Sequence, residues 1–248
     1  MHAAIDTLGY RPSPIARALV SGQTRLLALL VSDIANPFYP QLAKSVEQAA
    51  KRDDYTVIIC NTEDRTAETR RYIERLLRQG LDGVIHASAA RDEKVLLSLM
   101  DDPRRVVFTN RRPSSNSVSY VVSDNRSGAI ELTRYLLSRG HRRIGFIAGP
   151  SFARDATERL DGFAAALAAG GLRVPQDVAL AGFDGVQLVA SRIFDLTTVD
   201  QHIEQMGRLA VQILLRQLAD SASDVPTHEV LPTELLLRGS TEGVPVAI

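Results

Sequence analysis

Short apolar runs alternate with helical patterns along the first half of the chain. Four runs rich in aliphatic residues come at regular intervals: Leu26–Val31, Thr56–Cys60, Gly83–His86 and Val106–Phe108. Between the first two runs, and again between the second and third, apolar residues recur three and four positions apart, as on the buried face of a helix. Strands alternating with helices predict an α/β fold, in which helices cover both faces of a parallel sheet.

The second half repeats this alternation over a shorter length. The predicted strands are Tyr120–Val122, Ile144–Ile147, Val178–Ala181 and Val230–Leu237. Helical spacing marks the stretch that ends at Gly140, the stretch around Thr157–Ala169, and the stretch from Ile203 to Leu214. Two α/β lobes joined by crossovers fit this order. One long doubly wound sheet is the alternative, because it would produce a similar pattern.

The first 25 residues differ from the rest. Ser13 can cap a helix and Pro14 suits its first position, so a short helix is predicted over Ile15–Val20. Three arginines and one aspartate make the stretch locally basic: Arg11, Arg17, Arg25 and Asp6. It is therefore predicted either to contact nucleic acid or to serve as a solvated linker.

Composition narrows the location and the partners. The 29 basic residues equal the 29 acidic ones, so no net charge draws the protein to DNA or to an anionic membrane, and any DNA contact must be local. The single cysteine, Cys60, lies in an apolar run and is expected to be a buried thiol. The longest apolar run, Leu26–Val31, is too short to span a bilayer, and no signal peptide pattern begins the chain. These features predict a cytoplasmic protein.

The sequence lacks the motifs of common enzymes. It has no glycine-rich phosphate loop, no nucleophile elbow, and no carboxylate pair at a spacing that suggests acid–base catalysis. Its five histidines are scattered, and His141 is expected to be structural. We therefore expect no catalysis, no metal and no cofactor. A hydrolase without a known motif remains the alternative, because a fold does not determine a function.

The N-terminal stretch carries the first part of a resemblance. The string Ala4-Ile5-x-x-Leu8-Gly9-Tyr10-x-Pro12-x-Pro14-Ile15-Ala16-Arg17-x-Leu19-x-x-Gly22 resembles the end of the DNA-binding headpiece of LacI/GalR transcriptional regulators, followed by its hinge helix. The resemblance implies a homodimer whose paired hinge helices contact the minor groove through Arg11, Ala16, Arg17 and Leu19. It assigns Leu19 to the wedge that opens a base step; the alternative is that Leu19 covers the protein body.

The same resemblance indicates a missing part. The family's helix-turn-helix, which reads bases in the major groove, would precede Met1. The chain as written is therefore expected to lack sequence-specific DNA binding: either translation starts upstream, or the protein is a sensor without its headpiece.

The remaining chain resembles the family's sensor. This implies a two-lobed, periplasmic-binding-protein-like (type I) fold of parallel sheets flanked by helices. Asn36-Pro37-Phe38-Tyr39 is similar to the first pocket loop, which implies that Phe38 and Tyr39 contact the ligand. Its position after a strand supports this, since ligands bind at the carboxyl ends of strands in open α/β sheets. The alternative is an aromatic pair that packs in the core.

Two motifs in the second lobe resemble pocket motifs of the family. Arg159, in Glu158-Arg159-Leu160-Asp161-Gly162-Phe163, is implied to bind the ligand, because a guanidinium can donate two parallel hydrogen bonds to hydroxyls or a carboxylate. The alternative is a surface ion pair with Asp155, four residues earlier. Asp184, in Ala181-Gly182-Phe183-Asp184, is implied to accept hydrogen bonds from the ligand.

Two more residues are candidates by position. Asn110, with Arg111 beside it, follows the strand that ends at Phe108. Asp124 lies in Val122-Ser123-Asp124-Asn125, which resembles the crossover between the lobes. Asp124 is a candidate ligand contact, and the alternative is an N-cap of the following helix.

The resemblance also predicts domain boundaries. Residues 1–24 form the headpiece remnant and hinge, 25–124 and 190–228 the N-terminal subdomain, and 125–189 and 229–248 the C-terminal subdomain. After Leu172 the chain runs directly into Arg173-Val174-Pro175, where the family has roughly fifty to sixty more residues, about two βα units at usual element lengths. We therefore expect a shortened second lobe that lacks part of one cleft wall.

The function implied is a LacI/GalR-type transcriptional regulator. It would bind a small, sugar-like effector between its lobes and control operator binding through the hinge. A solute-binding protein of the same fold is the first alternative. A DNA-incompetent dimerisation partner of full-length homologues is the second.

Overall fold

The computed structural model describes residues 23–88, 91–141, 144, 154–169, 181–186, 196–219 and 225–241. Several predictions lie outside these residues. They are the hinge contacts Arg11, Ala16, Arg17 and Leu19, the helix over Ile15–Val20, most of the strands Ile144–Ile147 and Val178–Ala181, and the junction after Leu172.

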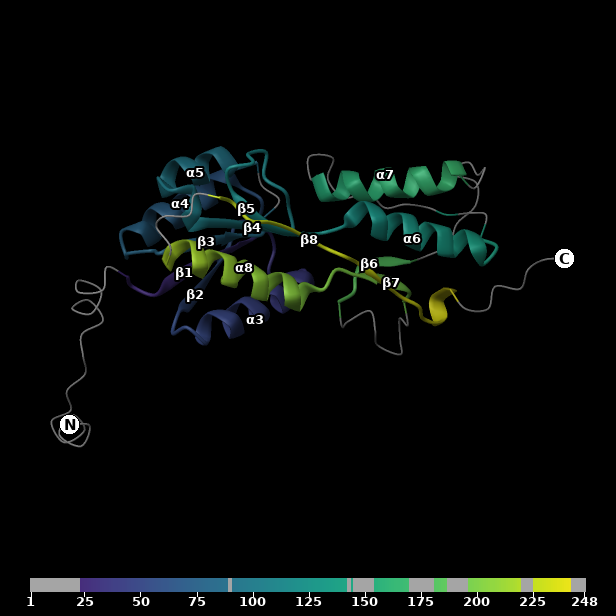
Figure 1. Ribbon diagram of the computed structural model, residues 1–248, viewed down its shortest axis with the longest axis horizontal. Coiled ribbons are helices and arrows are strands. Elements are labelled where there is room, and N and C mark those ends of the chain that lie inside the picture. Colours follow the sequence, from purple (N-terminus) through teal and green to yellow (C-terminus); the bar gives the residue numbers. More distant parts are fainter. Residues whose placement is uncertain are drawn as a thin grey trace, which may run out of the picture.

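The larger of two lobes is built on a six-stranded parallel sheet (Figure 1). In spatial order its strands are β2 (Thr56–Asn61), β1 (Leu26–Val31), β3 (Gly83–His86), β4 (Val106–Thr109), β5 (Ser119–Ser123) and β8 (His228–Leu231). The first five confirm the strands predicted from the apolar runs. Helices α4 (Thr66–Leu77) and α5 (Glu93–Met100) cover one face, and α3 (Phe38–Lys51) and α8 (Ile203–Ala219) cover the other.

Alternation along β1 explains this arrangement. Leu27, Leu29 and Val31 pack with α3 and α8, whereas Ala28 and Leu30 pack with α4 and α5. Successive side chains of a strand point to opposite faces, so a strand that is apolar throughout must be covered on both sides. That is why β1 lies inside the sheet and why a parallel α/β layer forms around it.

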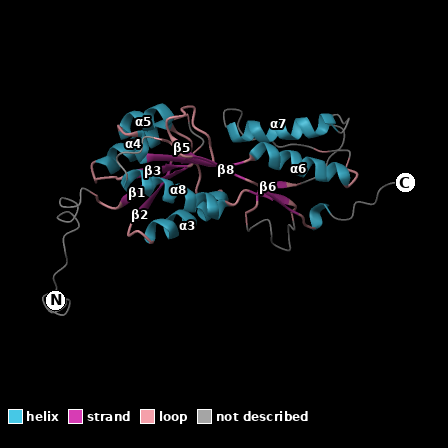
Figure 2. Ribbon diagram, viewed as in Figure 1, coloured by secondary structure: helices cyan, strands magenta, loops and turns pink. Residues whose placement is uncertain are grey.

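The smaller lobe has a three-stranded sheet of order β6 (Gly182–Asp184), β7 (Thr198–Asp200) and β9 (Glu234–Leu236). Strands β6 and β7 are parallel, and β9 runs antiparallel to β7. Helix α6 (Asn125–Ser138) packs on it, and α7 (Arg154–Ala169) packs along α6 (Figure 2). Gly162 permits this packing, since a Cβ there would lie 2.5 Å from the Arg126 carbonyl oxygen.

The prediction of one continuous strand over Val230–Leu237 is wrong. The chain forms β8 in the larger sheet, passes Pro232 and Thr233, and then forms β9 in the smaller sheet. Proline has no N–H to donate to a ladder, so it interrupts the strand where the chain changes lobes.

Sheet membership also moves two predicted boundaries. Strand β7 belongs to the smaller sheet although it lies after residue 190, and β8 pairs with β5 of the larger sheet although it extends past residue 228. Both strands are three or four residues long, too short for apolar periodicity to reveal which lobe they join.

Candidate ligand-binding site

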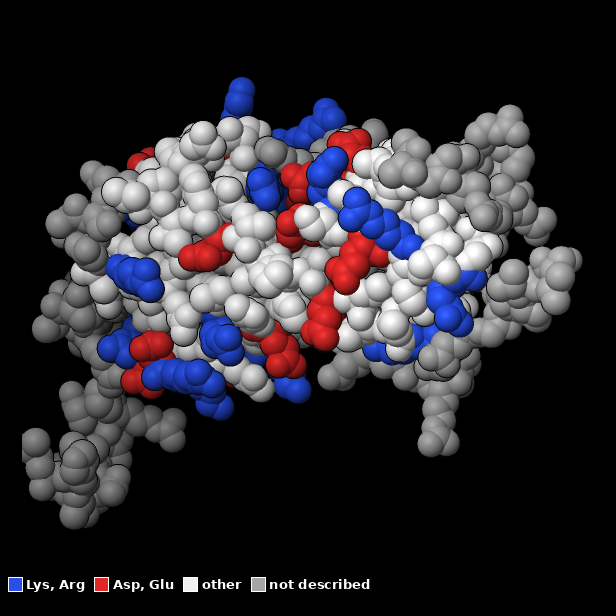
Figure 3. Space-filling model, turned by 45° about the vertical axis from the view of Figure 1, so that its right-hand side comes forward, with Lys and Arg blue, Asp and Glu red and all other residues white. Residues whose placement is uncertain are grey.

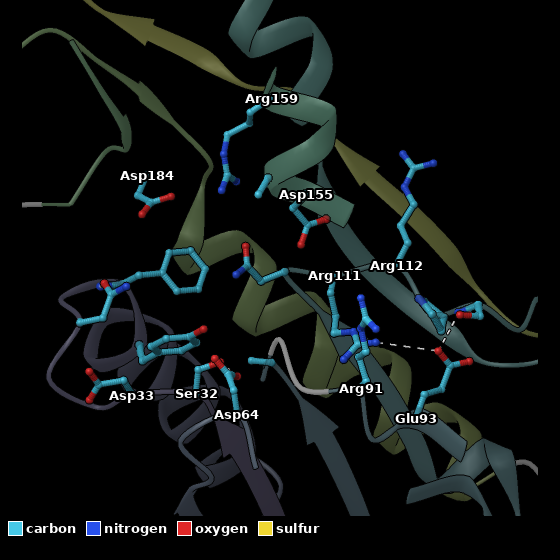
Figure 4. A pocket seen from close by; sticks show the side chains of 18 of the residues that line it. Ser32, Asp33, Asp64, Arg91, Glu93, Arg111, Arg112, Asp155, Arg159 and Asp184 are labelled. Atoms are coloured by element: carbon cyan, nitrogen blue, oxygen red, sulfur yellow. Dashed lines mark hydrogen bonds and ion pairs between the residues drawn. The ribbon is translucent and has the colours of Figure 1, made fainter. Parts of the chain in front are cut away.

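A cavity of about 650 Å³ lies between the two lobes, at the carboxyl ends of their strands (Figure 4). Polar residues dominate its lining, which includes Ser32, Asp33, Asn36, Phe38, Tyr39, Asp64, Arg91, Glu93, Lys94, Asn110, Arg111, Arg112, Asp155, Arg159 and Asp184. Acidic and basic side chains lie next to one another in a band across the middle of the face seen in Figure 3. Such a volume suits a small polar molecule.

Phe38 and Tyr39 line the cavity at the beginning of α3. Their rings meet edge to face, with centroids 5.3 Å apart, and both side chains are largely buried. The Asn36 side chain holds this turn, since its Oδ1 accepts a hydrogen bond from the Phe38 N–H at 3.1 Å. Burial raises the pKa of Tyr39 to about 12, and the carboxylates of Asp64, Asp184 and Asp155 add to the effect. The aromatic pair is therefore both core packing and cavity wall.

Arg159 reaches into the cavity from α7 (Figure 4). Its Nη1 donates to Asn125 Oδ1 at 2.9 Å, and its guanidinium carbon lies 5.1 Å from the centre of the Phe183 ring. No ion pair within 4.0 Å joins it to Asp155, although both residues are described. The guanidinium is thus fixed by an amide and an aromatic face, which leaves other N–H groups to face the cavity.

Asp184 is the last residue of β6 and lines the cavity, as Arg159 does, from the smaller lobe. Its backbone has φ 91°, a conformation unusual for a residue with a side chain. Gln201 Nε2 donates to its Oδ1. Burial raises the pKa of Asp184, while Arg159 and the hydrogen bond from Gln201 oppose the shift. Asp184 is therefore a partly buried acceptor in the lining of the cavity.

The larger lobe contributes a hydrogen-bonded floor. Asp64 accepts from the hydroxyl groups of Ser32 and Ser88, and Ser88 also accepts from Thr62. Asn110 directly follows β4, has φ 58° and lines the cavity. The polar groups of this wall are held by one another before any ligand arrives.

Arg111 and Glu93 shape the basic side of the cavity. Arg111 Nη1 donates to the Ser88 carbonyl at 3.2 Å and lies 3.8 Å from Asp92 Oδ1. Glu93 accepts from the backbone N–H groups of Ser114 and Ser115 at 2.7 and 2.9 Å. These bonds anchor the loop after β4, which carries the arginines, to the first turn of α5.

The buried carboxylate of Asp92 holds the guanidinium of Arg111. His86 Nε2 lies 2.9 Å from Asp92 Oδ1, and both side chains are fully buried. The hydroxyl of Thr69 donates to the other oxygen of Asp92. The hydrogen bonds from His86 and Thr69, with the charge of Arg111, outweigh burial and lower the pKa of Asp92. Asp92 thus remains an anion that holds Arg111 in place.

One contact joins the lobes across the mouth of the cavity. Arg112 Nε lies 4.0 Å from Glu158 Oε1, on α7. The two side chains are partly buried, so this pair fixes the distance between the lobes only weakly.

Asp124 lies away from the cavity lining. It is the N-cap of α6, where its Oδ1 accepts from the Ser127 N–H at 3.0 Å. The capping interpretation of Asp124 is the one that the structure supports. The other five candidates, Phe38, Tyr39, Asn110, Arg159 and Asp184, all line the same cavity.

Sequence reasoning missed several lining residues. Ser32 and Asp33 directly follow β1, so the rule that ligands meet the carboxyl ends of strands would have found them. Glu93, Lys94 and Asp155 lie in first turns of helices, and nothing in the local sequence shows that these turns face a cavity. Within the described part of the chain, no three His, Cys, Asp or Glu side chains gather to hold a metal ion. None of the helices described there is long and apolar enough to cross a membrane.

Comparison with known proteins identifies close counterparts of this architecture. A family model for periplasmic binding proteins and the sugar-binding domain of the LacI family matches residues 24–218. A ribose operon repressor from Halalkalibacterium halodurans is 30% identical, over 97% of this chain and 86% of the relative. Relatives of this kind are transcriptional repressors, not enzymes, which agrees with the expectation of a non-catalytic protein.

Solved structures share the fold. A transcriptional regulator named CelR, in complex with cellobiose, superposes with a TM-score of 0.75 and 26% identity, over 96% of this chain and 89% of that one. A LacI-type protein from Alkaliphilus metalliredigens, in complex with D-xylulofuranose, has a TM-score of 0.79 and 22% identity, over 88% and 100% of the two chains. The parallel sheet flanked by helices is therefore the periplasmic-binding-protein-like type I fold predicted from the sequence.

The alignment with the ribose operon repressor also bears on length. It runs over 291 positions while taking in 97% of a chain of 248 residues, so about fifty positions have no residue of this chain opposite them. That number is close to the block expected to be missing after Leu172. By the family match and by its relatives, this chain belongs to the family of periplasmic binding proteins and LacI-type sugar-binding domains.

Proposed function

We propose that this protein is a LacI-type transcriptional regulator that binds a sugar or related polyhydroxyl effector in the cavity between its lobes. The observation that carries the proposal is that aromatic residues line the cavity on one side and charged residues line it on the other. Phe38 and Tyr39 line the cavity from the larger lobe, and Arg159 and Asp184 line it from the smaller lobe. An apolar face with a few fixed donors and acceptors is what recognition of a sugar needs.

The relatives support a sugar as the effector. One is named a ribose operon repressor, and two structural neighbours are complexes with cellobiose and D-xylulofuranose. A ligand that contacts both walls would favour the closed arrangement of the lobes, because it can shift an equilibrium only by binding one state better.

The proposal extends to DNA. We infer a homodimer in the cytoplasm whose hinge residues Arg11, Ala16, Arg17 and Leu19 contact operator DNA. The resemblance of residues 1–22 and the repressor names of the relatives support this. In a form of the protein that also carries the family's helix-turn-helix ahead of residue 1, Leu19→Ser is expected to weaken retardation of operator DNA in a gel without altering sugar binding. Equal retardation by both proteins would contradict the hinge contact.

Thermal melts and calorimetric titration with D-ribose, D-xylulose and cellobiose test the effector. A sugar at one hundred times its dissociation constant should add about 2.7 kcal/mol to the free energy of unfolding. Arg159→Ala should weaken that binding roughly ten- to one-hundredfold, the usual cost of losing charged hydrogen bonds. Arg126→Ala, at an exposed arginine of α6, is the control and should bind as the unaltered chain does. Melts that no sugar shifts would overturn the proposed effector class.

A further inference from the structure

Asp155 is the least explained charged group of the cavity. It is the second residue of α7 and lines the cavity from the smaller lobe. Only 8% of the residue is exposed, and its Oδ1 has no hydrogen-bond partner. Figure 4 shows its carboxyl group directed into the space between Arg159 and Arg111. A buried carboxylate oxygen without a partner costs free energy, so its presence calls for a reason.

Structural roles do not supply that reason. The neighbour expected to pair with it, Arg159, instead donates to Asn125. Its position in the first turn of α7 favours a negative charge through the helix dipole. The helix dipole therefore stabilises the charge of Asp155, but it provides no hydrogen-bond donor for Oδ1.

Charge around the cavity indicates what kind of group would meet this oxygen. Tyr39, from the opposite lobe, senses the carboxylates of Asp64, Asp155 and Asp184 together. The charges of these three acceptors thus reach the cavity side of Tyr39, while Arg159, Arg111 and Arg112 act on Asp155. A ligand group that meets Asp155 itself should be a hydrogen-bond donor, and a carboxylate or phosphate placed directly against Asp155 would be repelled.

We propose that Asp155 contacts the ligand directly, accepting a hydrogen bond from a hydroxyl or protonated amine, and that it excludes ligands with an anionic group at this end. This assignment rests on the proposed function, because it takes the cavity to be the effector site. The assignment also predicts the chemistry of the effector. The part of the effector that meets Asp155 should carry hydrogen-bond donors and should be neutral or cationic.

Two substitutions separate a ligand contact from a structural role. Asp155→Asn keeps the shape but removes the charge, and Asp155→Leu removes the acceptor. Asp161, an exposed aspartate of the same helix, provides matched controls in Asp161→Asn and Asp161→Leu. If Asp155 exists for the ligand, the ligand-free variants should melt at the same temperature as the unaltered protein or higher. A structural aspartate would show the opposite, a lower melting temperature.

Binding is then measured by calorimetry at pH 8, where Asp155 is ionised, with D-ribose, 1-amino-1-deoxy-D-ribitol and D-ribonate. We expect ribose or the amine to bind and the carboxylate to bind at least tenfold more weakly. Asp155→Asn should weaken binding several-fold and Asp155→Leu tenfold or more, while the Asp161 variants bind normally.

The outcomes distinguish the two proposals. Ribose binding that both Asp155 variants leave within twofold, or ligand-free variants that melt earlier, would overturn the role of Asp155 while the proposed function stands. If only the amine binds, and Asp155→Leu weakens it, the role of Asp155 is supported and the neutral sugar effector is not. If none of the three compounds binds, or if ribonate binds best, both are overturned.

Discussion

The two lobes differ in how firmly they are built. The larger lobe buries both faces of a six-stranded sheet, with separate apolar clusters under α3 and α8 and under α4 and α5. Among the residues that the structure describes, the smaller lobe has three short strands and an apolar cluster centred on Leu136, Ile144 and Phe163. Because apolar burial is the main stabilising term, the larger lobe should carry most of the stability. We therefore expect the smaller lobe to unfold more readily than the larger one.

The polar groups of the two cavity walls follow the same division. In the larger lobe, Asp64 and Glu93 already accept hydrogen bonds from serine hydroxyls or backbone N–H groups. In the smaller lobe, the described residues give Asp155 Oδ1 no hydrogen-bond partner. In the larger lobe, the buried Nε of the cavity residue Arg112 also has none. Each wall therefore keeps one group that a ligand could satisfy, and the open acceptor belongs to the smaller lobe.

The largest expected effect comes from the core of the larger lobe. Leu214, in α8, is fully buried and lies against Gly83 of β3. Leu214→Ala should lower the free energy of unfolding by about 3 kcal/mol, the usual cost of a buried cavity. Denaturant unfolding followed by circular dichroism measures it. Leu237→Ala, at a half-exposed leucine near β9, should change little. Equal losses would show that Leu214 does not lie in a tightly packed core.

A smaller effect is expected where the helices of the smaller lobe meet. Gly162→Ala would place a methyl group 2.5 Å from the Arg126 carbonyl oxygen, and backbone cannot yield as a side chain does. Overpacking of this kind costs about 2 kcal/mol. Hydrogen exchange should speed up in α6 and α7 while β1 and β3 remain protected. The exposed Ala164→Ser should leave both lobes unchanged. Faster exchange in β1 would mean that the lobes unfold as one unit.

The smallest effect is the pH dependence that Asp155 imposes. Burial raises the pKa of Asp155 from 3.8 to about 7; Glu158 adds to the shift, and Arg159, Arg111 and Arg112 oppose it. Between these two pH values the unfolded chain has released the proton and the folded chain retains it. The stability that this group contributes is therefore complete below about pH 4 and is lost as the pH rises through about 7.

Asp155→Asn removes this pH dependence, so comparing the variant with the unaltered protein isolates the contribution of Asp155. The free energy of unfolding of the unaltered protein, minus that of the variant, should fall between pH 4 and 7 and then level off. At pH 7.5 the variant should be more stable by on the order of 1 kcal/mol. Urea unfolding across this pH range measures the difference, with Asp161→Asn as the control. A difference that stays constant with pH would show that Asp155 is ionised and well solvated in the folded protein.

Sequence reasoning succeeded where a pattern has a single physical solution. The apolar runs of β1 to β5 predicted strands correctly, because a continuous apolar strand can be satisfied only inside a covered parallel sheet. Five of the six candidate ligand contacts line one cavity, and their contact with a ligand stays a prediction. For Asn110 and Asp184 the reason is that strand ends of parallel sheets share an edge. Asp124 was ambiguous for a physical reason: an aspartate before a helix suits both a cap and a contact.

Predictions from the sequence failed where a strand's sheet or a side chain's partner depended on residues far away in the chain. Strands β7, β8 and β9 are so short that only their partners determine which sheet they join. The alternative of a surface pair between Asp155 and Arg159 could not be rejected from the sequence, because only the fold brings Asn125, on another helix, to the arginine. Glu93 was missed, since its role depends on a loop more than twenty residues later.

The sequence by itself determined the α/β class, the order of the main elements and the family, because these depend on local periodicity and on short motifs. Only the tertiary structure decided how the chain divides between the two sheets and which acids and bases face the cavity. The reason is that burial and charge pairing are set by neighbours in space. A carboxylate such as Asp155 is ordinary in the sequence, and folding alone places it, without a partner, in the wall of a cavity.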